Sequence, residues 1–337
     1  MGPRTAVIGA GSWGTAVASL AAHNAPTALW ARRAELAADI ERTHVNADYL
    51  PQYQLPDQVH ATASLEEAVA GAEVVVMAVP SHGFRGVLDE ARPFLASGAP
   101  LVSLTKGVEQ DSLKRMTEVI DEVVPGHPRG VLTGPNLAKE VMAGWPAASV
   151  VAVDDADVAT DLQRLFSTEA FRVYTNRDVV GCEVGGALKN VIAIAAGIAD
   201  GMGFGDNTRA ALLTRGLAEL TRLGVALGGE PMTFAGLAGM GDLVATCSSR
   251  QSRNRHVGEE LGRGRSIEEI VAEMKMVAEG VKSSKAVVEL AARVEVEMPI
   301  AEQVVDVLYH GKQASEIVPA LMQREMKPEL HGIRSRN

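Results

Sequence analysis

The sequence predicts an α/β fold, with an N-terminal doubly wound sheet followed by an all-helical domain. Three observations predict it. A glycine-rich turn directly follows the first apolar segment, strand-like and helix-like segments alternate over about the first 175 residues, and long helical patterns begin at Glu183. A chain of 337 residues is too long for one ordinary core. We therefore expect two domains, at residues 1–180 and 181–337, with a frayed polar tail at 327–337.

Short apolar or β-branched runs predict the strands of the first domain, at residues 5–8, 27–30, 73–79, 101–104, 130–132 and 149–153. Helical patterns cover residues 15–23, 111–124 and 156–166. Ser64 with Glu67 three residues later is typical of a capping box and predicts a further helix start. Prolines punctuate residues 42–57, which we expect to be less regular.

The second domain is expected to contain only helices, at residues 183–199, 208–227, 267–274, 281–293, 301–309 and 314–322. Asp206 or Asn207 is the expected N-cap of the helix over 208–227, because short polar side chains accept hydrogen bonds from free backbone N–H groups. Gly228 and Gly229 would end that helix.

Charge and cysteine usage exclude several classes of protein. The net charge of −10 is a poor match for nucleic acid, whose binding needs a basic face. Cys182 and Cys247 form no CxxC pair, which suits a reducing cytosol. No signal peptide or run of about 18 apolar residues is visible, so we expect a soluble cytoplasmic protein without a membrane span. The histidines show no metal-ligand spacing, and no metal site is expected.

The glycine-rich turn predicts a dinucleotide site of the Rossmann type. Gly9, Gly11 and Gly14 follow the first strand and open the first helix. In this motif the first glycine allows the tight turn, the second lets the backbone approach a pyrophosphate, and the third lets helix and strand pack closely. The helix N-terminus adds free N–H groups and a positive dipole end.

The residues after the second strand favour NADP over NAD. NAD-specific sites place an acidic residue there for the ribose 2′-hydroxyl. This chain has Arg32 and Arg33 instead, with no acid before Glu35, and arginine suits a 2′-phosphate. The alternative is that both arginines are solvated at a helix start, and the chain could accept both cofactors.

Lys189 and Asn190 are unusual residues in the helix expected over 183–199. Apolar residues lie nearly all round that helix, so it should be buried. Desolvation lowers the pKa of a buried amine toward values useful for general acid–base catalysis. The alternative is a lysine at the helix edge whose ammonium reaches water. Spacing alone does not separate the two.

Other polar residues lie in loops where ligands commonly bind. Lys106 ends one predicted strand and residues 134–136 end the next, at the carboxyl edge of the sheet. In the helical domain, residues 239–242 form a glycine-rich turn ending in Asp242, and residues 252–255 offer donors suited to a phosphate. Each cluster alone is better explained by a turn or a solvated charge than by a ligand site.

Together, these segments identify a family. Motifs occur in order at residues 9–15 (GAGSWGT), 105–107 (TKG), 134–140 (GPNLAKE), 187–191 (ALKNV), 203–212 (GFGDNTRAAL), 241–243 (GDL) and 252–254 (SRN). With them the chain resembles bacterial NAD(P)-dependent glycerol-3-phosphate dehydrogenase over nearly its whole length. The resemblance implies a Rossmann-type domain, a helical second domain and a homodimer.

The resemblance also implies roles for residues at the matching positions. Besides the glycines, the implied cofactor contacts are Ser12, Trp13, Arg32, Arg33, Lys106, Ala138, Arg253, Val277 and Glu279. The implied substrate contacts are Lys106, Gly134, Asn136, Lys189, Asn190, Asp242, Thr246, Ser252, Arg253 and Asn254. Lys189 would donate and accept the proton, Asp242 would orient it, and Lys106 would touch both substrate and cofactor. Position 136 is often serine in bacterial members, which leaves the Asn136 contact less secure.

The implied reaction is the reversible reduction of dihydroxyacetone phosphate to sn-glycerol 3-phosphate by NADPH or NADH, supplying glycerophospholipid synthesis. Two-domain β-hydroxyacid and ketopantoate reductases are the enzymatic alternative, because they also use a lysine on the first helix of the second domain. A phosphate clamp at Arg253 and Asn254 separates the two, since those substrates lack the phosphate. A noncatalytic NADP-sensing protein or a structural protein are the alternatives outside enzymes.

Overall fold

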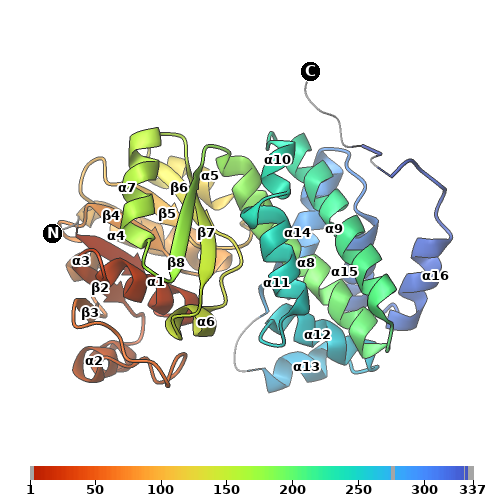
Figure 1. Ribbon diagram of the computed structural model, residues 1–337, viewed down its shortest axis with the longest axis horizontal. Coiled ribbons are helices and arrows are strands. Elements are labelled where there is room, and N and C mark those ends of the chain that lie inside the picture. The colour runs from red at the N-terminus through yellow and green to blue at the C-terminus, as the bar shows by residue number, and fades with distance from the viewer. Residues whose placement is uncertain (1–3, 275–277, 330, 333–337) are drawn as a thin grey trace. The chain divides into compact units, whose positions relative to one another are not determined.

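The structure, a computed structural model, describes residues 4–274, 278–329 and 331–332 (Figure 1). These residues form two compact units. The first holds the described residues up to Lys106 together with Lys114–Val179, and the second holds Gly107–Leu113 and the described residues from Val180 onward. Within the second unit, Val108 and Leu113 form an apolar cluster with Ala286 and Leu290.

One sheet of eight strands forms the centre of the first unit. The strands are β1 (Thr5–Ile8), β2 (Thr27–Trp30), β3 (Val59–Thr62), β4 (Val74–Met77), β5 (Leu101–Ser103), β6 (Arg129–Thr133), β7 (Ala147–Val153) and β8 (Phe171–Asn176). Their order is β3-β2-β1-β4-β5-β6-β7-β8, and neighbours are parallel except β6 with β7. The strand order reverses between β1 and β4, the position at which open α/β sheets bind ligands.

Helices cover both faces of this sheet (Figure 1). They are α1 (Ser12–Ala22), α2 (Ala34–Thr43), α3 (Leu65–Val69), α4 (Ser81–Ala91), α5 (Met116–Val123), α6 (Ala138–Met142) and α7 (Ala156–Phe166). Because side chains alternate along a strand, Val7 enters the cluster with α1, α2, α6 and α7, while Ala6 and Ile8 enter the cluster with α3, α4 and α5. The predicted doubly wound fold is confirmed.

The differences from the predicted elements of this unit have local causes. The edge strands β3 and β8 were missed, because edge strands with exposed residues give a weak apolar signal. The helices α4 and α6 were also missed, while α2 begins at Ala34, where a helix start was raised only as an alternative. Helix α5 begins at Met116 rather than at residue 111, since Leu113 has a φ of 59° that no α-helix contains. Ser64 caps α3 as predicted. The predicted capping box is incomplete, because the Glu67 carboxylate accepts a hydrogen bond from the Thr62 hydroxyl and not from the backbone N–H of Ser64.

The second unit is all-helical in its described residues, as predicted. Its helices are α8 (Val179–Gly201), α9 (Asp206–Ala226), α10 (Pro231–Phe234), α11 (Asp242–Ser248), α12 (Arg253–Gly262), α13 (Ile267–Glu273), α14 (Glu279–Arg293), α15 (Pro299–Tyr309) and α16 (Ile317–Met322). The glycine-rich turns hid α10, α11 and α12 from the sequence pattern. The predicted cap of α9 was wrong, because Gly205 is its N-cap and no side chain bonds there.

Helix α8 runs through the core of this unit. By length and composition it could cross a membrane, but 94% of its most apolar 18-residue window is buried among the described residues. Val191, Ile192 and Ile194 of α8 pack in one cluster with residues of the surrounding helices. The helix is therefore the core helix that the sequence pattern indicated.

Glu219 of α9 ties that core to α15. It is almost fully buried, and its carboxyl oxygens accept hydrogen bonds from Ile300 N (2.8 Å) and Ala301 N (3.3 Å) in the first turn of α15. Burial raises the pKa of Glu219 to about 7, although the two backbone N–H groups and Arg222 oppose that shift.

Replacing Glu219→Gln should make the stability of the protein depend less on pH between about 4.5 and 7. A folded-state pKa above the unfolded value near 4.5 contributes stability that is complete below pH 4.5 and is lost as the pH rises through about 7. The amide keeps an acceptor for Ile300 N but carries no proton to lose. Urea unfolding should show the variant gaining on the wild type as the pH rises from about 4.5 to about 7, by at most about 3 kcal/mol, with a constant difference at higher pH. A constant difference from pH 5 to pH 9 would contradict this.

Candidate active site

The glycine-rich turn has the geometry that dinucleotide binding needs. Gly9 has a φ of 124°, and a Cβ there would lie 2.6 Å from Ala78 O. A Cβ on Gly14 would lie 2.0 Å from Gly9 O, so helix and strand touch at this point. Gly11 differs, since a Cβ there would meet nothing within 4 Å, which leaves room for a ligand against its backbone. No acidic residue occupies the first turn of α1.

Two side chains around this turn have atoms that the described protein does not satisfy. Trp13 packs against Phe171, with ring centroids 6.3 Å apart, and its buried Nε1 has no acceptor among the described residues. Asn46 is fully buried and donates to Ala10 O (3.0 Å) and Thr15 Oγ1 (2.8 Å). Its Oδ1 also lacks a partner there. Asn46 thus holds the turn from the loop after α2, a role that sequence reasoning missed.

The two arginines after β2 differ in their surroundings. Both are exposed. Arg33 forms an ion pair with Asp48, which raises the pKa of its guanidinium through the hydrogen bond and the opposite charge. Arg32 has no hydrogen bond or ion pair among the described residues. Arg32 is therefore the guanidinium ready to receive a 2′-phosphate, while Arg33 must first leave Asp48.

Lys106, Gly134 and Asn136 meet at the carboxyl ends of β5 and β6. Lys106 Nζ donates to Gly134 O at 3.0 Å. Gly134 has a φ of 138°, and a Cβ there would come within 3.2 Å of Ser149 Cα. The Asn136 amide donates to Ser149 Oγ (3.2 Å), while its buried Oδ1 has no donor among the described residues. Ala138 begins α6 directly after this loop.

Lys189 does not reach water. It is 5% exposed, and its ammonium donates to the Asp242 carboxylate and to Thr246 Oγ1 (2.8 Å). Asp242 and Thr246 lie four residues apart on α11 and so face the same side of that helix. The reading of Lys189 as a snorkelling surface lysine is wrong. A buried amine with fixed hydrogen-bond partners is suited to proton transfer.

Cys247 lies beside this pair but cannot replace it. Burial raises the pKa of its thiol to about 12, with the Asp242 charge acting in the same direction and Lys189 opposing it. A thiol with that pKa stays neutral near pH 7 and is not a nucleophile. Lys189 therefore remains the group of this cluster that can exchange a proton.

The start of α12 brings the predicted phosphate-binding residues next to α8. Ser252 is the N-cap of α12, accepting from Arg255 N (3.2 Å), and Arg253 follows as an exposed residue. Asn254 is buried: its amide donates to Asn190 Oδ1 (2.9 Å), and its Oδ1 accepts from Gly280 N (2.9 Å). Asn254 therefore joins α12 to α8 and α14. The second N–H of its amide is the donor left for a ligand.

Glu279 begins α14 beside the same cluster. Burial raises the pKa of its carboxyl, against the charges of Arg253 and Lys282. Val277, the other predicted residue of this segment, lies outside the described residues.

The described residues thus form two sets of candidate ligand contacts, one in each unit. The first unit gathers the glycine turn, Arg32 and the edge around Lys106, and its open side at Gly11 and the unsatisfied Trp13 Nε1 fit a dinucleotide. The second gathers Lys189 and Asp242 with the start of α12. No group of three or more potential metal ligands occurs in the part of the chain that the structure describes.

Family models match both units. The model described as NAD-dependent glycerol-3-phosphate dehydrogenase N-terminus matches residues 4–159, and the one described as the C-terminus of that enzyme matches residues 178–319. Together they cover most of the chain.

Curated relatives and a solved structure agree with these models. A protein named glycerol-3-phosphate dehydrogenase [NAD(P)+] 2 from Sphingopyxis alaskensis is 57% identical over 328 residues, covering 97% of this chain and 98% of the relative. One named glycerol-3-phosphate dehydrogenase [NAD(P)+] 1 from Mycobacterium tuberculosis is 51% identical, covering 98% and 97%. A crystal structure of glycerol-3-phosphate dehydrogenase from Coxiella burnetii has a TM-score of 0.92 and 36% identity, covering 96% and 99%.

The two arginines should contribute unequally to cofactor choice. Replacing Arg32→Ala should raise the Michaelis constant for NADPH about 10–100-fold, the loss of one charge-assisted contact, and leave that for NADH nearly unchanged. Arg33→Ala should raise it less, because its guanidinium already pairs with Asp48. Arg42→Ala, which breaks the ion pair with Asp39, is the matched control. Equal losses with NADPH and NADH would contradict a 2′-phosphate contact.

Proposed function

We propose that this chain, which belongs to the NAD-dependent glycerol-3-phosphate dehydrogenase family, reduces dihydroxyacetone phosphate reversibly to sn-glycerol 3-phosphate with NADPH or NADH. The observation that carries the proposal is the buried Lys189 ammonium, which is held by Asp242 and Thr246 on one side of α8 while Asn190 of the same helix bonds the start of α12. A proton donor and a phosphate-binding helix start are thus connected through a single helix.

Bound NAD(P)H supplies the hydride for the C2 carbonyl. The chain's own contribution is the proton and the positioning. As the carbonyl carbon accepts hydride, its oxygen becomes an alkoxide, and Lys189 donates a proton to that oxygen. Asp242 holds the ammonium in place and lowers the cost of keeping its charge in an apolar core. In the reverse direction neutral Lys189 takes the proton from the C2 hydroxyl.

The substrate phosphate is assigned to the start of α12. Arg253 offers two parallel donors to a phosphate, and the helix N-terminus adds a positive dipole end. No acidic residue occupies the first turn of α12 to repel an anion. The phosphate does not react, so its binding can position the carbonyl for hydride transfer. Lys106, Gly134 and Asn136 are proposed to complete the substrate contacts from the first unit.

Further proposals concern the cofactor and the cellular setting. Ser12, Trp13, Arg32, Ala138 and Glu279 are proposed to contact the dinucleotide, with NADP favoured because Arg32 stands where NAD sites carry an acid. The residues 1–180 are proposed as the cofactor domain and 181–337 as the substrate and catalytic domain. A homodimer in the cytoplasm, supplying glycerophospholipid synthesis, is proposed from the family membership.

The decisive assay compares substrates. Oxidation of NADPH, followed by its absorbance, should be fast with dihydroxyacetone phosphate and slower by about 10⁴ in catalytic efficiency with dihydroxyacetone, since a site built for a phosphate leaves its donors unpaired without one. Arg253→Ala should narrow this difference in catalytic efficiency, mainly by lowering the efficiency with the phosphorylated substrate. Comparable efficiency for both substrates, or faster turnover of ketopantoate, would replace the proposal with a hydroxyacid reductase.

Removing the amine should impair chemistry rather than cofactor binding. Replacing Lys189→Met keeps the length of the side chain and should lower turnover about 10²–10⁴-fold, the usual contribution of a general acid. Binding of NADPH, measured by fluorescence, should be unchanged because Lys189 is not among the residues proposed to contact the dinucleotide. Near-normal turnover in a folded variant would remove Lys189 from the mechanism. If the protein were a noncatalytic NADP sensor, even the wild type would show no turnover.

A further inference from the structure

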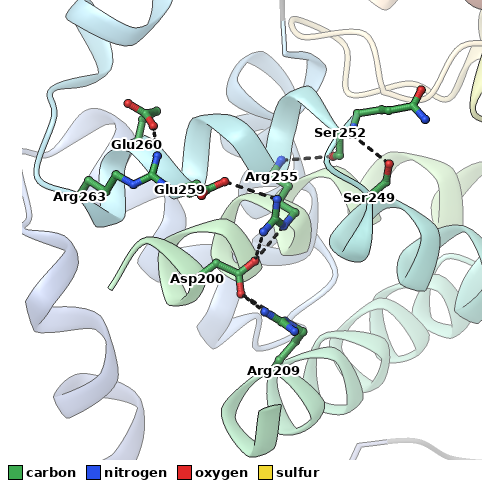
Figure 2. Close-up of polar contacts among 9 residues, drawn as sticks. Asp200, Arg209, Ser249, Ser252, Arg255, Glu259, Glu260 and Arg263 are labelled. Atoms are coloured by element: carbon green, nitrogen blue, oxygen red, sulfur yellow. Dashed lines mark hydrogen bonds and ion pairs between the residues drawn. The ribbon is translucent and has the colours of Figure 1, made fainter. Parts of the chain in front are cut away.

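Asp200, near the end of α8, carries an ion-pair network that the proposed mechanism does not use (Figure 2). Its side chain is 7% exposed. One carboxylate oxygen accepts from Arg255 of α12, at 2.8 Å from Nε and 2.6 Å from Nη2. The other accepts from Arg209 of α9, at 2.6 Å from Nη2 and 3.2 Å from Nε. Each carboxylate oxygen is thus held by two nitrogen atoms of a different arginine.

Between the site and Asp200, the backbones of α8 and α12 touch. A Cβ on Gly197 would lie 2.0 Å from Arg255 O, and one on Gly258 would lie 2.0 Å from Ile194 O. One turn further on, a Cβ on Gly201 would lie 2.1 Å from Glu259 O. The glycines therefore fix how far apart the two helices lie.

Glycines do not fix how the helices are aligned along their length. A helix surface made of glycines has no side-chain ridge that could fit into a groove of the other helix. It therefore offers little resistance to sliding of α8 along α12. Alignment must come from side-chain pairs that join the same two helices. Two such pairs are the hydrogen-bonded Asn190 with Asn254 at the site and Asp200 with Arg255 beyond it. The second pair is charge-assisted and therefore the stronger.

The alignment matters because each helix carries part of the site. Lys189 is on α8, and Arg253 with Asn254 opens α12. If Arg255 lost Asp200, its other partner would be Glu259, 3.4 Å away on α12 itself. Arg255 would then bond within its own helix, and the ion pair between α12 and Asp200 of α8 would be lost.

We propose that Asp200 is a positioning residue which, through Arg255, sets the place of the phosphate-binding start of α12 relative to Lys189. The inference rests on the function proposed above. Asp200 touches neither the reacting atoms nor the phosphate in this role. Its contribution is confined to the use of the substrate phosphate, so it affects the phosphorylated substrate and not its phosphate-free analogue.

The test compares Asp200→Asn with the wild type on two substrates. The Michaelis constant for dihydroxyacetone phosphate should rise about tenfold or more, since a misplacement of about 1 Å can cost up to 10²-fold. The catalytic efficiency with dihydroxyacetone and the dissociation constant of NADPH should stay unchanged. Arg209→Gln is the matched control, because it releases the other oxygen of the same carboxylate and leaves Arg255 in place.

Pairing is tested by a double-mutant cycle. Asp200→Asn combined with Arg255→Gln should be no worse than either change alone, because both remove one interaction. If Asp200→Asn fails to fold, Arg255→Lys keeps the charge beside Asp200 but loses the two-donor fork, and it should raise the same Michaelis constant by a smaller factor. Equal losses with both substrates, additive effects in the cycle, or an equal effect of Arg209→Gln would overturn the inference. A wild type inactive on dihydroxyacetone phosphate would instead overturn the proposed function.

Discussion

The burial of one ammonium, that of Lys189, is the constraint on which the helical unit depends. A lysine inside an apolar core is strongly unfavourable without an anion and further hydrogen bonds. The chain meets this requirement by bringing α11 against α8, where Asp242 and Thr246 reach the amine. That approach needs glycines. A Cβ on Gly185 of α8 would lie 2.6 Å from Ala238 O, in the turn that leads into α11. The Lys189–Asp242 pair and the packing of these helices are therefore one arrangement.

The sequence predicted those parts of the site that depend on local geometry. The roles of Gly9, Gly11 and Gly14 follow from the spacing of the turn, and the structure shows one forced φ, one open side and one close contact. The sequence did not decide whether Lys189 is buried or reaches water. Its partner Asp242 lies 53 residues away, and no local pattern joins the two residues. The family resemblance assigned that pairing, and the geometry of the two side chains agrees with it.

Loops were predicted least well. Asn46 lies in the irregular stretch over residues 42–57, where neither apolar period nor motif marks it, yet it is fully buried against the glycine turn. Asp48 in the same loop pairs with Arg33, so the difference between the two arginines was invisible from composition. Helix α12 was missed as a helix although its first residues were singled out, because the polar Asn254 and the glycine Gly258 interrupt the apolar pattern of its buried face. Contacts made by glycine leave no apolar signal to read.

An acidic chain can still bind two phosphate-bearing ligands, and the distribution of acids among its helix starts shows how. Acidic residues occupy the first turn of α2, α3, α7 and α13, where they stabilise the positive end of the helix dipole. The first turns of α1 and α12 have none, and neither do those of α4, α8, α10 and α16. A carboxylate there would satisfy the same dipole and repel an approaching phosphate. Because α1 and α12 are the helices assigned to the pyrophosphate and to the substrate phosphate, the net charge of −10 is compatible with anion binding. Local placement of charge, and not its sum, decides which helix starts remain open to a ligand.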